Sequence, residues 1–180
     1  HFGGIPLLLL AALYQDRRKH ALHIAGPPDI ESRVRALARA LGHGIEDQEW
    51  TFPIHFSEVP VGTESAVGPA RIQSFETKHQ IEAHPQGYRL DLGGRPIAYS
   101  GDTGWFPELP RLCAGADLFI CECTLRHETL DFHLNLETIE EHQPDFDCGR
   151  LVLTHPGEAM AGLRGELSIE TADDGLVIEI

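Results

Sequence analysis

The chain has 180 residues, of which 42% are hydrophobic and 23% are charged, and this size and composition predict one domain spanning residues 1–180. The formal net charge is −14, from 14 basic and 28 acidic side chains, which argues against an extended nucleic acid as a partner. No apolar run reaches the ~18 to 20 residues that span a bilayer, so we expect no membrane attachment.

The first part of the chain alternates helical and extended patterns. Residues 4–18 and 27–41 are expected to form helices, with a strand at 21–26 between them. Further strands are predicted at residues 51–59, 71–79, 87–92 and 95–102. The glycine pair of DLGGRP favours a tight hairpin between the last two of these strands, and residues 61–69 have the most loop-like composition.

The alternation continues to the end of the chain. Helices are expected near residues 106–113 and 135–142 and from residue 158, and strands at residues 116–124, 150–155 and 175–180. Strands that alternate with helices indicate an α/β domain.

The four cysteines contain no CxxC pair and are too few for a disulfide scaffold, which favours a reducing, cytoplasmic location. Cys121 and Cys123 lie two residues apart in an apolar strand and therefore share one of its faces. We expect them to be thiols of the hydrophobic core.

Three predicted strands end in residues that can bind a metal. IAYSGDTGW places Asp102 after an apolar strand and between glycines, RLVLTHPG places His155 after a second one, and QSFETKH ends at His79. Taken singly, Asp102 could cap the next helix and each histidine could be a surface residue. Together, imidazole and carboxylate groups at several strand ends predict a site for a borderline metal such as Zn²⁺.

The series HFGGIPLLL, a strand leading to His79, GYRLDLGGRPIAYSGDT, ADLFICECT and LVLTHPG resembles the metallo-β-lactamase-fold hydrolases. Within them it is most similar to the ribonuclease Z-like phosphodiesterases. The resemblance covers essentially the whole chain and implies an αββα sandwich. It also implies that His1 ends a His-x-His-x-Asp-His motif, so that the other ligands of this motif and several N-terminal strands would precede the first residue.

The resemblance further implies a dinuclear site with two divalent ions, Zn²⁺ in the first place, with Mn²⁺ or Fe²⁺ as alternatives. Asp102 would bridge the ions, His1 and His155 would bind one of them, and His79 would bind the other. His84 competes with His79 for the last role, because the GYRL strand follows it more closely.

A finer similarity concerns Glu122 in CECT and His133 in FHLNLET, which match a glutamate and a histidine outside the metal shell of ribonuclease Z-like members. Glu122 would orient His133 by accepting a hydrogen bond, and His133 would protonate the leaving group. The alternative for His133 is a surface residue at the start of a helix. Cys121 stands where ribonuclease Z enzymes often carry histidine, and no Gly- and Lys-rich insertion could serve as a tRNA-gripping arm.

The residues at the strand ends and the family resemblance together predict a metal-dependent hydrolase of a small phosphodiester. Its catalytic residues would be Asp102, Glu122 and His133. One alternative is a hydrolase of a thioester, lactone or other carbonyl ester on the same site. The other is a non-catalytic binding or scaffold domain of the same fold. A small molecule is the expected partner, and the resemblance adds a homodimer.

Overall fold

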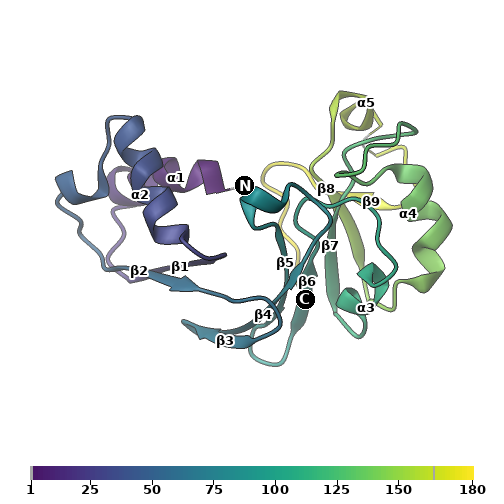
Figure 1. Ribbon diagram of the computed structural model, residues 1–180, viewed down its shortest axis with the longest axis horizontal. Coiled ribbons are helices and arrows are strands. Elements are labelled where there is room, and N and C mark those ends of the chain that lie inside the picture. Colours follow the sequence, from purple (N-terminus) through teal and green to yellow (C-terminus); the bar gives the residue numbers. More distant parts are fainter. Residues whose placement is uncertain (1, 164) are drawn as a thin grey trace. The chain divides into compact units, whose positions relative to one another are not determined.

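A computed structural model describes residues 2–163 and 165–180, and the chain divides into two compact units, His1–Pro60 and Val61–Ile180 (Figure 1). The assignment of residues 1–180 to one domain stays a prediction.

The N-terminal unit is a two-stranded parallel sheet with two helices. Its elements are the short 3-10 helix Phe2–Gly4, α1 (Ile5–Tyr14), β1 (Leu22–Gly26), α2 (Ile30–Ala40), the 3-10 helix Ile45–Asp47 and β2 (Ile54–Glu58). Pro6 lies in the first turn of α1, where its missing N–H leaves no helical hydrogen bond unmade. Leu9, Ile24 and Val34 bring α1, β1 and α2 into one core. The predicted helices and strands of this unit are confirmed, although α1 ends already at Tyr14.

The C-terminal unit is built on a seven-stranded sheet whose strands lie in chain order. The strands are β3 (Glu64–Val67), β4 (Ala70–Glu76), β5 (Gln86–Asp91), β6 (Pro96–Tyr99), β7 (Leu118–Glu122), β8 (Leu151–Thr154) and β9 (Glu170–Thr171). The helices are the 3-10 helix Ile81–Ala83, α3 (Leu109–Cys113), α4 (Leu136–His142), the 3-10 helix Gln143–Asp145 and α5 (Glu158–Ala161). The α/β class is therefore confirmed.

Strand direction decides which residues meet. Strands β3 to β6 pair in antiparallel fashion, and β6 to β9 pair in parallel. Because β5 is the single strand between β4 and β6 and is antiparallel to both, β4 runs in the same direction as β6, β7 and β8. The C-terminal ends of these four strands therefore lie along one edge of the sheet.

The core of this unit joins the helices to the middle of the sheet. Leu109 of α3, Ile139 of α4 and Met160 of α5 pack in one buried cluster with Phe119 of β7 and Leu153 of β8. Cys121 and Cys123 are buried in the same cluster, which confirms them as core thiols. A sheet fixed in this way holds the loops at its C-terminal edge on a rigid support.

Two predictions of secondary structure are wrong. Residues 175–180 form no strand, because the sheet edge beside β8 is taken by Glu170 and Thr171, and Arg150 holds Glu170 there with contacts of 2.6 and 2.7 Å. Residues 61–69 are not all loop. Gly68, with φ of 56°, starts a tight turn before Pro69 that folds β3 back onto β4.

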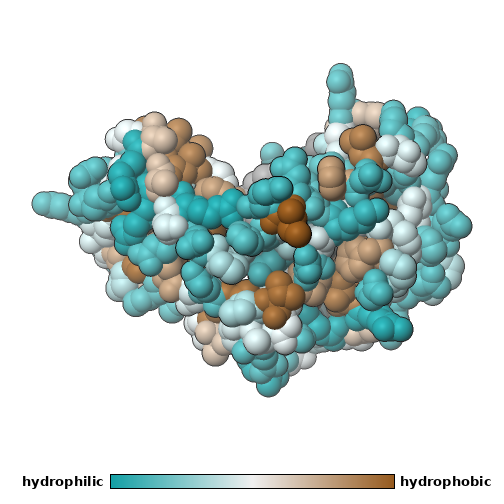
Figure 2. Space-filling model, in the orientation of Figure 1, coloured by the Kyte–Doolittle hydropathy of each residue, from teal (hydrophilic) through white to brown (hydrophobic). Residues whose placement is uncertain are grey.

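Figure 2 shows a molecular face on which hydrophilic residues predominate, with a few small hydrophobic patches. Within the described parts of the chain, no helix combines the length and the apolar character that crossing a membrane requires.

Candidate metal centre

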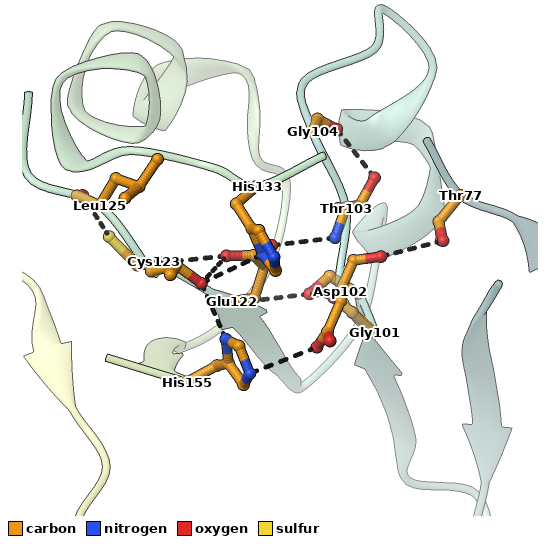
Figure 3. A network of polar contacts seen from close by, with 12 residues as sticks. Thr77, Gly101, Asp102, Thr103, Gly104, Glu122, Cys123, Leu125, His133 and His155 are labelled. Carbon is orange, nitrogen blue, oxygen red and sulfur yellow. Dashed lines mark hydrogen bonds and ion pairs between the residues drawn. The ribbon is translucent and has the colours of Figure 1, made fainter. Parts of the chain in front are cut away.

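Polar side chains gather at the C-terminal edge of the seven-stranded sheet. Glu122 is the last residue of β7, His155 follows β8 directly, and Asp102 and His79 lie in the turns after β6 and β4. The shared direction of these four strands is the reason that segments far apart in the sequence meet here. Figure 3 shows Glu122, His133, His155 and Asp102 side by side in one polar network.

The turn after β6 fixes the position of Asp102. Ser100 is buried, accepts the backbone N–H of Glu122 at 2.8 Å and donates to the carbonyl of Gly101 at 2.7 Å. Gly101 has φ of 62°, and a Cβ there would lie 2.4 Å from the carbonyl oxygen of Gln86, so this position requires glycine. The turn is thereby locked to both neighbouring strands, and the side chain of Asp102 remains 11% exposed.

Glu122 is a buried carboxylate surrounded by donors. It is 1% exposed, and Oε1 accepts the backbone N–H of Thr103 at 2.9 Å and faces Nδ1 of His133 at 2.8 Å. Oε2 accepts the backbone N–H of Thr124 at 3.0 Å and its hydroxyl at 2.8 Å. With both oxygens engaged, Glu122 is suited to orienting its neighbours rather than to abstracting a proton.

The carboxylate sets the tautomer of His133. An ionised carboxylate accepts but does not donate, so Nδ1 of His133 carries the hydrogen and Nε2 is left for other partners. The ring is 21% exposed and therefore open to a substrate on one side. The predicted hydrogen bond between Glu122 and His133 is present in the structure, while the catalytic roles of both residues stay predictions.

Thr124 extends the network to His155. Its hydroxyl hydrogen is directed to Glu122, so its oxygen accepts from Nδ1 of His155 at 2.8 Å. In this tautomer Nε2 of His155 carries no hydrogen, and it lies 3.9 Å from Oδ1 of Asp102. Sequence analysis missed Thr124. Its place directly after the strand end at Glu122 was the available signal.

The geometry fits a metal ion. The 3.9 Å between Nε2 of His155 and Oδ1 of Asp102 is too long for a hydrogen bond, but one ion with bonds of ~2.0 to 2.2 Å could contact both atoms. Glu122, His133 and His155 also bring one ligand atom each within 4.8 Å of one another. Both oxygens of Glu122 already accept hydrogen bonds, which favours a role in orienting neighbouring side chains over direct contact with an ion.

The remaining predicted ligands differ in what the structure says of them. The ring of His79 lies 5.1 Å from that of His133, edge to face, so this residue belongs to the same edge of the sheet. His84 is exposed and follows the 3-10 helix Ile81–Ala83. His1 lies outside the described residues. The choice of His79 over His84 as a ligand is supported by this placement and stays a prediction.

Two further histidines, His127 and His142, form contacts of a similar kind away from this network. His127 lies 2.6 Å from Glu137, and His142 lies 2.9 Å from Asp145 and stacks on Trp105 with 3.9 Å between ring centroids. Like His133, His127 has a carboxylate partner, but the side chains of both His127 and Glu137 are exposed. This makes it a matched control for substitutions of His133.

Relatives of this chain resemble it over most of its length. An uncharacterized protein of Mycobacterium tuberculosis is 32% identical over 171 residues, which cover 86% of this chain and 59% of that protein. A ribonuclease Z of Mycolicibacterium gilvum is 26% identical over 182 residues, with 85% of this chain and 64% of that protein covered. The chain thus spans less than two thirds of the length of these relatives.

Comparison with solved structures gives the same fold. The metallo-β-lactamase fold protein YhfI from Bacillus subtilis superposes with a TM-score of 0.70 at 22% identity, covering 99% of this chain and 73% of that protein. Residues 1–156 also match the beta-lactamase superfamily domain. This match covers most of the chain, including Asp102 and His155 at the sheet edge, and it shows that the chain belongs to the metallo-β-lactamase superfamily.

Proposed function

We propose that the protein is a metal-dependent hydrolase of a small phosphodiester. The observation that carries the proposal is the 2.8 Å contact between His133 and the buried carboxylate of Glu122, next to the pair formed by Asp102 and His155. This arrangement supports the proposal because an oriented imidazole stands beside two side-chain atoms that could bind a metal. Distant similarity to ribonuclease Z supports the same class of reaction.

Asp102 and His155 would hold one divalent ion, and Asp102 and His79 would hold a second. Their imidazole and carboxylate groups favour Zn²⁺, although Mn²⁺ or Fe²⁺ would accept the same set. Bound there, such ions activate water and offset negative charge on the phosphate oxygens. His1, the remaining ligand that the family resemblance implies, lies outside the described residues.

His133 would act on the leaving group. When water attacks phosphorus, the bond from phosphorus to the leaving oxygen breaks, and that oxygen takes a proton from Nε2 of His133. Glu122 helps because its negative charge, held 2.8 Å from Nδ1, stabilises the protonated ring before the transfer. Because the ring is partly exposed while Glu122 is buried, the proton donor faces the substrate and its partner does not.

The expected substrate is small. The net charge of −14 repels a long polyanion, whereas a single phosphodiester group is attracted locally by bound cations.

Leaving-group dependence tests the role of His133. We expect His133→Ala in the intact protein to slow hydrolysis of an alkyl phosphodiester by ~10² to 10⁴-fold, the usual contribution of a general acid. It should slow a p-nitrophenyl phosphodiester far less, because p-nitrophenolate departs without a proton. His127→Ala, which removes a histidine from an exposed carboxylate pair, should affect neither substrate.

Two outcomes would overturn the proposal. If His133→Ala leaves both phosphodiesters unaffected while Asp102→Ala abolishes turnover, His133 is no general acid and a carbonyl ester becomes the better substrate class. If metal analysis of the intact protein gives near zero equivalents, and Asp102→Ala and His155→Ala change nothing, the scaffold alternative is favoured.

A further inference from the structure

The loop between β7 and α4 carries His133 and has a four-residue turn, residues 130–133, at its tip. Leu130 and His133 pair across this turn, with a hydrogen bond of 3.4 Å from the N–H of His133 to the carbonyl of Leu130. Asp131 and Phe132 occupy its two central positions. The loop therefore presents Phe132 directly next to the proposed proton donor.

The base of the loop is tied to the body of the unit. Leu125 and Asn135 bridge its two ends, and Leu136 donates to the carbonyl of Leu125 at 2.9 Å. The side chain of Asn135 donates to the carbonyl of Glu128 at 3.1 Å and caps α4 through the N–H of Thr138 at 2.8 Å. A loop bound in this way keeps its tip in one place.

The tip is also buttressed from the side by the turn after β6. The backbone of Gly104 packs so closely against Asp131 that a Cβ on Gly104 would lie 2.0 Å from the carbonyl oxygen of Asp131. Gly104 donates in turn to the carbonyl of Lys78 at 2.8 Å, in the segment that carries His79. Phe132 is thus held relative to both Asp102 and His79 by backbone contacts.

Phe132 is a large apolar side chain that is 46% exposed. Its ring lies 5.9 Å from the ring of His79, tilted by 59°, and the ring of His79 also lies 5.1 Å from that of His133. Leu130, on the same tip, is 56% exposed. A single exposed apolar ring is ordinary on a protein surface. What distinguishes Phe132 is its position beside His79 and His133, where a group of the substrate would cover the exposed part of the ring.

We propose that Phe132 is a specificity-determining residue whose ring stacks on a planar aromatic group of the substrate, so that the preferred phosphodiester carries a nucleobase. This inference rests on the proposed function, since it names the substrate class of the same site. Stacking on an aromatic side chain is worth ~1 to 3 kcal/mol per base, which corresponds to ~5 to 150-fold in affinity. The effect belongs in binding rather than in the chemical step.

A pair of matched substrates isolates the contribution of the base. Adenosine cyclic phosphate closed across the two vicinal ribose hydroxyls and the corresponding cyclic phosphate of glycerol share one five-membered phosphodiester, but only the first carries a base. In the intact protein, Phe132→Ala should raise KM for the adenosine compound by ~10-fold or more with kcat little changed, and should leave KM for the glycerol compound unchanged.

Further variants separate stacking from apolar bulk and from loop damage. Phe132→Tyr and Phe132→Trp should retain the wild-type KM for the adenosine compound, whereas Phe132→Leu should behave like Phe132→Ala. Leu130→Ala, on the same exposed tip, should leave both KM values unchanged. Equal effects of Phe132→Ala on both substrates, or no effect on either, would overturn the inference.

Equilibrium dialysis of adenosine monophosphate distinguishes failure of this inference from failure of the proposed function. If the wild type hydrolyses neither compound yet binds the nucleotide ~10-fold more tightly than Phe132→Ala, phosphodiester hydrolysis is wrong and the stacking site stands. If both proteins bind the nucleotide equally, the stacking site is wrong whatever the activity shows.

Discussion

Oγ1 of Thr124 lies 2.8 Å from Nδ1 of His155, so the hydroxyl of Thr124 determines that Nε2, and not Nδ1, is the ring nitrogen of His155 that could bind a metal. The same hydroxyl lies 2.8 Å from the buried carboxylate of Glu122. Thr124 therefore links Glu122 to His155 through two hydrogen bonds, and such links orient the ligands at metal sites and raise their basicity.

Replacement of this hydroxyl should weaken metal binding. We expect Thr124→Val, which keeps the branched shape, to lower the affinity for Zn²⁺ by ~10 to 100-fold, the usual effect of losing an outer-shell partner. Thr124→Ser retains the oxygen and should bind the metal as the wild type does. Competition with a chromophoric chelator measures both, and wild-type affinity in Thr124→Val would show that the hydroxyl does not orient His155.

Gly104→Ala should destabilise the protein because the new Cβ would collide with the backbone of Asp131. Overpacking of this kind costs ~1 to 3 kcal/mol in the free energy of unfolding, which urea denaturation measures. Gly4→Ala is the control, since a Cβ at that position meets nothing within 4 Å. An unchanged urea midpoint in Gly104→Ala would mean that the loop of Asp131 and Phe132 is not held as described.

The core thiols should resist alkylation in the folded protein. Burial, followed by the charge of Glu122, raises the pKa of Cys121 well above its usual value, and burial raises the pKa values of Cys113 and Cys123 to about 12. Because the thiolate is the nucleophile, iodoacetamide at about pH 8 should modify half-buried Cys148 first and the others only after unfolding. Mass spectrometry of peptides checks this order, which early labelling of Cys121 would contradict.

Alkaline pH should destabilise the sheet through Tyr88. Burial first, and then the charge of Tyr99, raises the pKa of Tyr88 to about 12, whereas an unfolded tyrosine ionises near ~10. Between these values the unfolded chain loses a proton that the folded chain keeps, so this contribution is complete below pH ~10 and declines as pH rises toward the folded pKa. Urea midpoints measured across this range should fall less steeply in Tyr88→Phe, and parallel profiles would refute the assignment.

Much of the site was predictable because strand ends are visible in the sequence. Asp102 and His155 each follow an apolar run directly, and parallel strands bring such ends to one edge. His79 reaches the same edge because β5 is the single strand between β4 and β6 and runs against both. The glycines at 93 and 94, which form the hairpin from β5 to β6, indicated this reversal in the sequence. The contact of Glu122 with His133 was expected from family resemblance, not from spacing.

Other features could not be found in this way. Thr124 also follows a strand end, but a threonine there is not by itself a site residue, and its hydroxyl gains a role only when the fold places it between Glu122 and His155. Glu170 and Thr171 form the edge strand in place of the more β-like residues 175–180, and Arg150, just before the neighbouring strand, contacts Glu170 through two hydrogen bonds. Both features involve contacts between residues far apart in the sequence, which local propensity does not contain.

The reversal of β5 has a practical consequence. Since β5 runs against its neighbours, the hairpin that joins it to β6, residues 92–95, lies at the sheet edge opposite to Asp102. Gly93 and Gly94 are exposed there, and added Cβ atoms would meet nothing within 4 Å. A fluorophore or a fused domain inserted at this hairpin would therefore report on the protein from a distance, without touching the residues that it is meant to observe.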